Sequence, residues 1–358
     1  MPTLHDLHDA GQSVWLDFIR RDMLEDGQLA TLVAEGLRGM TSNPTIFQKA
    51  IAGTDLYDDA IAAADGDAAA VFESLAVDDI RAAADTLRPV YEASDAADGY
   101  VSLEVSPTLA YDTAGTITDA RRLWSRVDRP GLMIKVPAAD EGIPAIEELI
   151  AAGINVNATL MFSLDDYEAV AMAYVRGAER AEHPERLASV ASFFVSRVDT
   201  KVDAALEKDG SPEALALRGT IAVANAKLAY QRYREIFEGA PFAAARQRGA
   251  APQRPLWAST STKNPTYPDL LYVDELVGAN TVNTMPPATL DAFRDHGVVD
   301  PSALSEGVDE ARARIEALAE FGIDFDAITA DLQAEGVASF SASYDDLLTA
   351  IDAELTRP

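Results

Sequence analysis

The stretch LMIKVPA, residues 132–138, has the composition of a short buried β-strand and carries a single lysine, Lys135. Successive side chains of a strand point to opposite faces. Leu132, Ile134 and Val136 therefore share one face, and the lysine points from the other. In a barrel, one face of each strand packs on helices and the other points into the interior. The alternation thus predicts a lysine inside a barrel.

Seven further runs of this kind occur along the chain, and helix-like sequence follows each of them. They are VWLDFI (14–19), RGMTSN (38–43), YVSLEVS (100–106), INVNATLMF (154–162), SVASFFVS (189–196), PLWASTS (255–261) and NTVNTMP (280–286). Strand–helix alternation indicates a parallel sheet covered by helices, so the fold class is α/β. Eight repeats favour a closed (β/α)8 TIM barrel over an open sheet. No GxGxxG follows a strand, which leaves a dinucleotide-binding fold without its main support.

The segments between the strands carry helical spacing. Residues 67–93 predict one long helix, residues 211–237 predict another, and residues 302–355 predict two or three more. Residues 238–254 are expected to form a loop before the seventh strand. With no linker or internal repeat, we expect one domain over residues 1–358, a barrel with additional helices.

The composition limits the partners. A net charge of −30 argues against binding to nucleic acid, which requires a basic surface. No apolar stretch reaches the roughly 18 residues of a membrane span. No basic segment followed by an apolar run opens the chain, and cysteine is absent, so we expect a cytoplasmic protein. With four histidines and no cysteine, we expect no metal site. The pattern is compatible with a monomer or a homodimer.

The inward faces of other strands are also polar. They carry Asp17; Ser102, Glu104 and Ser106; and Asn155, Asn157 and Thr159. Burial disfavours the charged form of an amine, and the neutral form is the one that attacks carbonyl carbon. Barrel enzymes act at the carboxyl ends of their strands, where several of these residues lie. Lys135 is therefore predicted to be a covalent nucleophile. The alternative is a structural ion pair of Lys135 with Asp17 or Glu104.

Arg197, Ser259 and Lys263 follow the sixth and seventh strands. A guanidinium, a hydroxyl and an ammonium at a barrel mouth are suited to binding a phosphate group. The alternative interpretation is ordinary surface charge.

Seven segments in order give the chain a resemblance to transaldolases, specifically the longer form typical of actinobacteria. They are TSNPTIF (41–47), VSLEVSP (101–107), IKVPA (134–138), INVNATLMFS (154–163), ASFFVSRVD (191–199), WASTSTKNP (257–265) and ANTVNTMPP (279–287). The resemblance covers about residues 11–350. It implies a transferase of the pentose phosphate pathway that moves a dihydroxyacetone unit between sugar phosphates and requires no cofactor.

The resemblance also implies roles for individual residues. Lys135 matches the Schiff-base lysine and Asp17 the acid–base residue. Glu104 and Thr159 match the pair that handles a catalytic water. The matching substrate-binding residues are Asn43 and Asn157 for the dihydroxyacetone unit, Ser192 for a hydroxyl, and Arg197 with Ser259 for phosphate. Many transaldolases have an arginine two residues after that serine, where this chain has Ser261. Lys263 is the expected substitute.

Two alternatives to a transferase remain. Fructose-6-phosphate aldolases are related, shorter barrels with glutamine at the position of Glu104 and tyrosine at that of Phe194. The glutamate and the phenylalanine found here favour transfer, because Phe194 has no hydroxyl that can help to protonate the enamine. A barrel that only binds sugar phosphates is the second alternative, and the presence of Lys135 and both acids argues against it.

Overall fold

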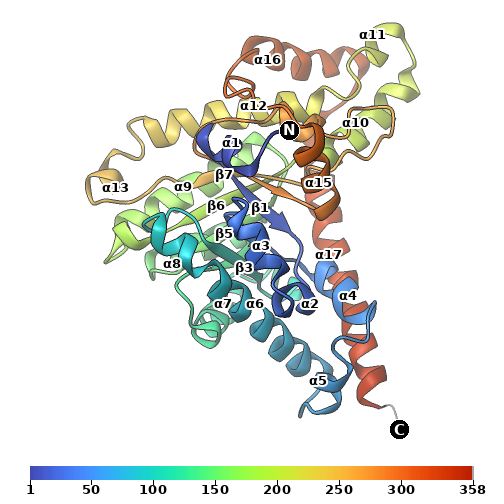
Figure 1. The fold of residues 1–358 in the computed structure, drawn as a ribbon. Helices are drawn as coiled ribbons and strands as arrows, with labels where there is room; N and C mark the ends of the chain where they lie inside the picture. The colour runs from blue at the N-terminus through green and yellow to red at the C-terminus, as the bar shows by residue number, and fades with distance from the viewer. Residues whose placement is uncertain (357–358) are drawn as a thin grey trace.

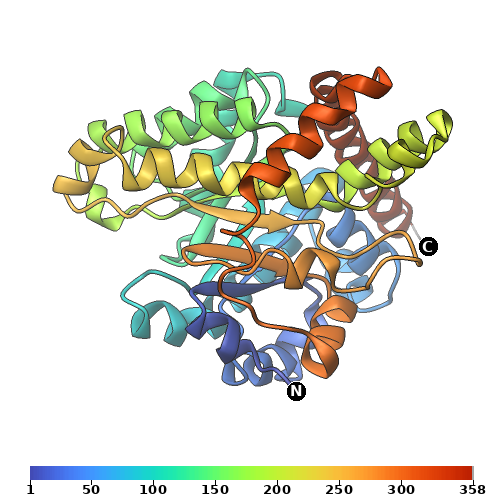
Figure 2. The same cartoon turned by 90° about the horizontal axis from the view of Figure 1, so that it is seen from above.

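The computed structural model describes residues 1–356 and contains a closed barrel of eight parallel strands, ordered β1 to β8 around the ring (Figures 1 and 2). The (β/α)8 prediction is therefore confirmed. The strands are β1 (Gln12–Asp17), β2 (Gly39–Thr41), β3 (Tyr100–Glu104), β4 (Leu132–Pro137), β5 (Val156–Met161), β6 (Ser189–Phe194), β7 (Arg254–Ala258) and β8 (Thr281–Met285).

Helices surround the barrel and extend beyond it. Those before β5 are α1 (Leu4–Asp9), α2 (Arg21–Glu25), α3 (Gln28–Ala34), α4 (Pro44–Ala52), α5 (Asp58–Ala62), α6 (Ala68–Ala93), η1 (Pro107–Leu109), α7 (Thr113–Val127) and α8 (Gly142–Ala151). Those after β5 are α9 (Leu164–Arg180), η2 (Pro184–Arg186), α10 (Ser196–Asp209), α11 (Pro212–Leu215), α12 (Ile221–Tyr233), η3 (Arg234–Glu238), α13 (Ala243–Gln247), α14 (Leu271–Asp274), α15 (Pro287–His296), α16 (Val308–Ala317), η4 (Leu318–Phe321) and α17 (Phe325–Leu355). Within residues 1–356, no helix is long and apolar enough to cross a membrane.

The helix predictions are partly right. The long helix over 67–93 is confirmed as α6, and residues 302–355 hold two α-helices and a 3-10 turn. Residues 211–237 do not form one helix, because Gly219 takes a left-handed φ of +69° between α11 and α12. The prediction that 238–254 is only a loop is wrong, since it contains α13, whose Ala245 is buried.

Several strands end earlier than predicted. β2 stops at Thr41 because Asn43 caps the next helix, accepting a hydrogen bond from the backbone N–H of Ile46 at 2.9 Å. Pro44 occupies the first turn of that helix, where its missing N–H costs nothing. β3 likewise stops at Glu104, before the proline of η1. The predicted inward position of Ser106 is therefore wrong, because this residue lies beyond the strand.

The lower part of the barrel interior is filled by aromatic side chains. Trp15 of β1 is fully buried, and its ring lies 6.4 Å from that of Tyr100 on β3. Gly39 on β2 pairs with both residues in the strand register. A Cβ at Gly39 would lie 2.6 Å from Cε2 of Trp15, so only glycine leaves room for the indole. This packed layer separates the polar upper interior from the amino end of the barrel.

The last helix, α17, crosses the carboxyl end of the barrel and runs beside α4 (Figure 1). Gln333 of this helix donates hydrogen bonds from Nε2 to the carbonyl oxygens of Ala138 (3.1 Å) and Leu160 (3.3 Å). Leu160 has a left-handed φ of +63° where the register between β5 and β6 shifts. The helix thereby brings residues from the end of the chain over the barrel mouth.

Replacement of Gly39 by alanine should destabilise the barrel by about 1–3 kcal/mol, because the added Cβ overpacks the layer that Trp15 fills. Chemical denaturation of Gly39→Ala measures this loss. A double-mutant cycle with Trp15→Leu serves as the control, since removal of the indole should make Gly39→Ala less costly. Equal costs in both backgrounds would contradict the packing argument.

Candidate active site

Lys135 lies in the barrel interior with its side chain 5% exposed. Its Nζ donates hydrogen bonds to Oε2 of Glu104 at 3.0 Å and to the carbonyl oxygen of Ser42 at 3.1 Å. The strand register places Glu104 directly beside Lys135. Nζ also lies 5.3 Å from the ring centroid of Phe340 on α17. The ion pair that the sequence allowed is therefore formed with Glu104, at the carboxyl end of the strands where barrel enzymes act.

Burial raises the pKa of Glu104, while the nearby charge of Lys135 and its hydrogen bond oppose this shift. A carboxyl group in this environment takes up a proton more readily than one in water. The pair can exist as ammonium with carboxylate, or as amine with carboxylic acid. Transfer of one proton over 3.0 Å interconverts the two forms.

Asp17 at the end of β1 is held by a chain of hydroxyl groups. Thr41 donates from Oγ1 to Oδ1 of Asp17 at 2.7 Å, and the hydroxyls of Thr41 and Thr284 lie 2.7 Å apart. Burial raises the pKa of Asp17, whereas the bond from Thr41 and the charge of Lys135 lower it. No described residue hydrogen-bonds Oδ2 of Asp17, so this oxygen is available to a bound molecule.

Two amides flank the lysine, and they are held differently. Asn157 is fully buried; it donates from Nδ2 to Oγ of Ser102 at 3.0 Å and accepts from Oγ of Ser192 at 2.7 Å. Asn43 uses Oδ1 as the cap of α4, which leaves its Nδ2 for other partners. Ser102 and Ser192 thus fix the orientation of Asn157, and the helix start fixes that of Asn43.

Two buried oxygen atoms beside Lys135 have no hydrogen-bond partner in the described part of the chain, namely Oε1 of Glu104 and Oγ1 of Thr159. Buried polar atoms are normally satisfied by protein or by ordered water. The two residues come from β3 and β5, on either side of the strand that carries the lysine. Their unused capacity is what a water molecule next to the amine requires.

Positive charge gathers at the outer end of the site. Arg197 in the first turn of α10 and Lys263 after β7 form no salt bridge with any described residue, and burial lowers the pKa of both side chains. Lys263 donates to Oγ of Ser261 at 2.6 Å. The charges of Arg197 and of Lys49 lower the pKa of Lys263 further, whereas Asp17 raises it. Lys49 from α4 is thus a third cation of this group.

Ser259 connects this end of the site to the strand ends. It has a left-handed φ of +57°, which is uncommon for a residue with a side chain and typical of functional sites. Its hydroxyl lies 2.9 Å from that of Ser196 at the start of α10.

A cavity of about 380 Å³ opens at the barrel mouth and joins these groups. Nine of the eleven side chains predicted from the sequence line it: Asp17, Asn43, Lys135, Thr159, Ser192, Phe194, Arg197, Ser259 and Lys263. Glu104 and Asn157 do not line it but hydrogen-bond to Lys135 and Ser192, which do. We call this space the mouth cavity. Three of the six lysines of the chain, Lys49, Lys135 and Lys263, line it.

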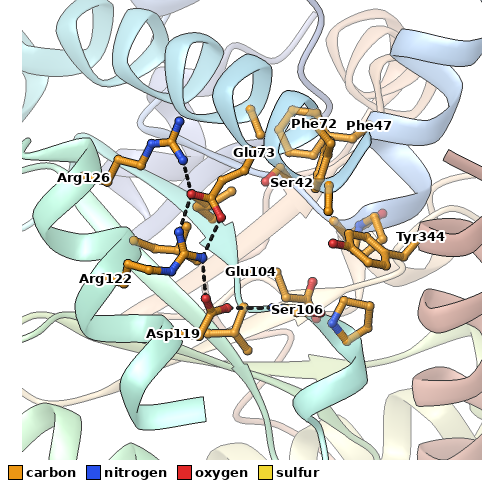
Figure 3. A pocket seen from close by; sticks show the side chains of 18 of the residues that line it. Ser42, Phe47, Phe72, Glu73, Glu104, Ser106, Asp119, Arg122, Arg126 and Tyr344 are labelled. Carbon is orange, nitrogen blue, oxygen red and sulfur yellow. Dashed lines mark hydrogen bonds and ion pairs between the residues drawn. The ribbon is translucent and has the colours of Figure 1, made fainter. Parts of the chain in front are cut away.

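A second cavity of similar volume lies outside the barrel, between α6, α7 and α17 (Figure 3). Glu73 lies between Arg122 and Arg126 and forms ion pairs with both, and Asp119 pairs with Arg122 at 2.5 Å. Ser106 faces this cavity. Asn43 and Glu104 of the predicted site also line this cavity. Its two arginines are paired with carboxylates, whereas Arg197, Lys49 and Lys263 of the mouth cavity form no salt bridge with a described residue. The mouth cavity, which also holds the buried amine, is therefore the candidate active site.

The sequence interpretation missed five residues that the structure brings to the site. They are Thr41, Ser42, Lys49, Thr284 and Phe340. Signals were available for four of them: Thr41 and Ser42 lie within the second strand run, Thr284 lies within the eighth, and Lys49 is a rare lysine in an acidic chain. Phe340 gave none, because its position depends on how α17 crosses the mouth.

Comparisons with known proteins agree with this geometry. The family described as "Transaldolase/Fructose-6-phosphate aldolase" matches residues 14–351. A protein of Thiobacillus denitrificans named "Transaldolase" is 52% identical over 354 residues, covering 97% of this chain and 98% of the relative. Proteins of the same name from Frankia alni (50%; 99% and 98% covered) and Thermobifida fusca (51%; 98% of each) are similarly alike. The chain therefore belongs to the transaldolase/fructose-6-phosphate aldolase family.

Proposed function

We propose that this protein is a transaldolase that transfers a dihydroxyacetone unit between sugar phosphates through an imine on Lys135. Relatives named transaldolase, about half identical over nearly the whole chain, support the activity. The observation that carries the chemical detail is the buried Lys135–Glu104 pair, with the unpartnered oxygens of Glu104 and Thr159 beside it. Imine formation must move one proton and one water at this point.

The first half of the reaction follows from that pair. Proton transfer from Lys135 to Glu104 yields the neutral amine, which attacks C2 of a ketose phosphate such as fructose 6-phosphate or sedoheptulose 7-phosphate. Glu104 then returns the proton to the departing C2 hydroxyl, and the water leaves between Glu104 and Thr159. The product is an iminium ion, a cation that can accept an electron pair from the sugar.

Asp17 is the proposed base for the cleavage step. Its free oxygen takes the proton of the C4 hydroxyl, the C3–C4 bond breaks, and the bonding electron pair moves into the iminium to give an enamine. The aldose phosphate leaves, and an acceptor such as glyceraldehyde 3-phosphate or erythrose 4-phosphate reverses these steps. Asn43, Asn157 and Ser192 are the proposed partners of the three-carbon unit. The lysine itself supplies the electron sink, so the mechanism requires no cofactor.

The cations explain how an acidic protein binds anionic sugars. A net charge of −30 repels phosphate at long range. The mouth cavity contains Arg197, Lys263 and Lys49 without paired carboxylates among the described residues, so positive charge is concentrated there. Together with Ser259, they form the proposed phosphate site.

Borohydride reduction in the presence of fructose 6-phosphate should add the mass of the reduced sugar fragment to a peptide containing Lys135. Lys135→Ala should abolish both this adduct and turnover, because no other amine lies beside Glu104. Peptide mass spectrometry is the measurement, and Lys227→Ala is the control, since that lysine pairs with Glu275 outside the mouth cavity. A wild-type protein that forms no adduct would falsify the imine mechanism.

Phe194→Tyr should raise the ratio of aldol cleavage to transfer, because the new hydroxyl can protonate the enamine before an acceptor binds. Phe194 lines the mouth cavity, and its ring lies 5.6 Å from the guanidinium carbon of Arg197. The ratio is measured from free dihydroxyacetone released without an acceptor. Phe18→Tyr adds the same hydroxyl elsewhere in the cavity and is the control. An unchanged ratio in Phe194→Tyr would remove the argument against an aldolase.

Lys263→Ala and Lys49→Ala should each raise the KM for phosphorylated sugars about three- to tenfold, with a smaller effect on kcat, since each loses one charged contact to phosphate. Steady-state kinetics measures the split between the two constants. Lys208→Ala, at an exposed position near the end of α10, should leave KM unaltered. If Lys263→Ala behaves like this control, the lysine has no phosphate role.

A further inference from the structure

Two buried carboxylates on α10 take no part in the proposed reaction. Asp199 and Asp203 are 2% and 7% exposed, and their spacing of four residues puts them on the same face of the helix. Burial raises the pKa of both side chains, to about 6 for Asp199, and the nearby charge of Asp203 raises the pKa of Asp199 further. Burying two acids so close together is unfavourable unless their oxygens are well satisfied.

One oxygen of each acid binds the start of α12. Oδ1 of Asp199 accepts from the backbone N–H of Ala222 at 2.7 Å, and Oδ1 of Asp203 accepts from that of Gly219 at 3.0 Å. The residue that precedes α12, Thr220, does not cap it and donates its hydroxyl to the carbonyl of Leu217 instead. The carboxylate of Asp199 therefore satisfies an amide of the first turn of α12 that a capping side chain would normally bind, and that of Asp203 holds the residue just before the cap.

The other oxygen of each acid binds a tyrosine of the segment that follows β7. Tyr272 donates to Oδ2 of Asp199 at 2.8 Å, and Tyr267 donates to Oδ2 of Asp203 at 2.7 Å. We call these two acid–tyrosine pairs the carboxylate clamp. Within the segment, Thr262 donates to the carbonyl of Pro268 at 2.9 Å, so the loop is folded on itself around the first tyrosine.

The clamp joins the two segments that supply the phosphate site. Arg197 lies two residues before Asp199 on α10, and Lys263 lies four residues before Tyr267 in the loop. A small cavity of about 210 Å³ is lined by all four clamp residues and also by Lys263, which therefore separates the clamp from the mouth cavity. The position of the ammonium relative to the guanidinium depends on how the loop is held against α10.

We infer that Asp199 and Asp203 are positioning residues for phosphate recognition, which hold Lys263 and Ser259 at a fixed distance from Arg197 through Tyr267 and Tyr272. This inference rests on the proposed function, because it assumes that these cations bind the phosphate of the sugar. The clamp residues themselves touch neither the sugar nor the reacting atoms, and they act through Lys263 and Ser259. Carboxylate–hydroxyl bonds suit this role because they are directional, whereas an apolar contact permits sliding of the loop.

The test uses the double variant Tyr267→Phe/Tyr272→Phe, which removes both hydroxyls and retains both rings. Inorganic phosphate is the probe, measured as a competitive inhibitor against fructose 6-phosphate, and its inhibition constant should rise about tenfold. Borohydride trapping of unphosphorylated dihydroxyacetone on Lys135 should proceed at the wild-type rate, since the imine end of the site is not attached to the clamp. Asp199→Asn should shift the inhibition constant in the same direction.

Tyr100→Phe is the matched control. It removes a buried tyrosine hydroxyl that donates to the carbonyl of Ala96 at 2.7 Å, at the start of β3 and away from the mouth cavity. This variant should lose stability as the double tyrosine variant does, yet its inhibition constant for phosphate should be unchanged. A shift in thermal stability alone is thereby separated from a shift in phosphate binding.

Arg197→Ala separates the inference from the proposed function. If it weakens phosphate inhibition while the double tyrosine variant stays within about twofold of wild type, the positioning role is overturned and the phosphate site stands. If both leave inhibition unchanged, the phosphate site itself is wrong and the inference falls with it. Loss of dihydroxyacetone trapping in the double variant also overturns it, because the clamp would then support the whole barrel mouth.

Discussion

The buried ion pair between Lys135 and Glu104 is the interaction on which the rest of the site depends. Removing both charges from water costs several kcal/mol per ion, and a pair of apolar side chains often stabilises a core as well or better. The pair therefore contributes little to the stability of the fold. It does supply a proton donor and an acceptor 3.0 Å apart, with the unpartnered Oε1 of Glu104 and Oγ1 of Thr159 beside them. Every other group at the mouth is arranged around this one amine.

The net charge of the whole chain and the charge at the mouth cavity have opposite signs among the groups that bear on substrate binding. The chain as a whole carries a net charge of −30, whereas three of its six lysines and Arg197 converge on one cavity. The global charge opposes the approach of anionic sugars, and the local cations oppose this effect at the proposed phosphate site. Holding such cations together is itself unfavourable, since the charges of Arg197 and Lys49 lower the pKa of Lys263. The carboxylate clamp on α10 is the structural element that we infer keeps them in position.

Alternation within strands was enough to predict the barrel, and it placed Lys135, Asp17, Glu104 and Thr159 on inward faces. It worked because a barrel strand has only two faces and each contacts a different environment. Features set by long-range packing were not predictable. Phe340 reaches Lys135 only because α17 crosses the mouth, and Leu160 takes a left-handed conformation where the sheet register shifts. Ser106 was misplaced because a proline ends its strand early, which alternation alone does not reveal.

Oxygen exchange at C2 of the ketose tests the central claim most directly, because formation of an imine on Lys135 releases that oxygen as water, in addition to the slow exchange that hydration of the free ketose allows. Fructose 6-phosphate labelled with ¹⁸O at C2 is incubated with the protein without an acceptor sugar. The wild type should release the label to solvent faster than the free sugar does, and Glu104→Gln should slow this release by about two orders of magnitude. Release by Glu104→Gln at the wild-type rate, or by the wild type no faster than by free sugar, would contradict the account.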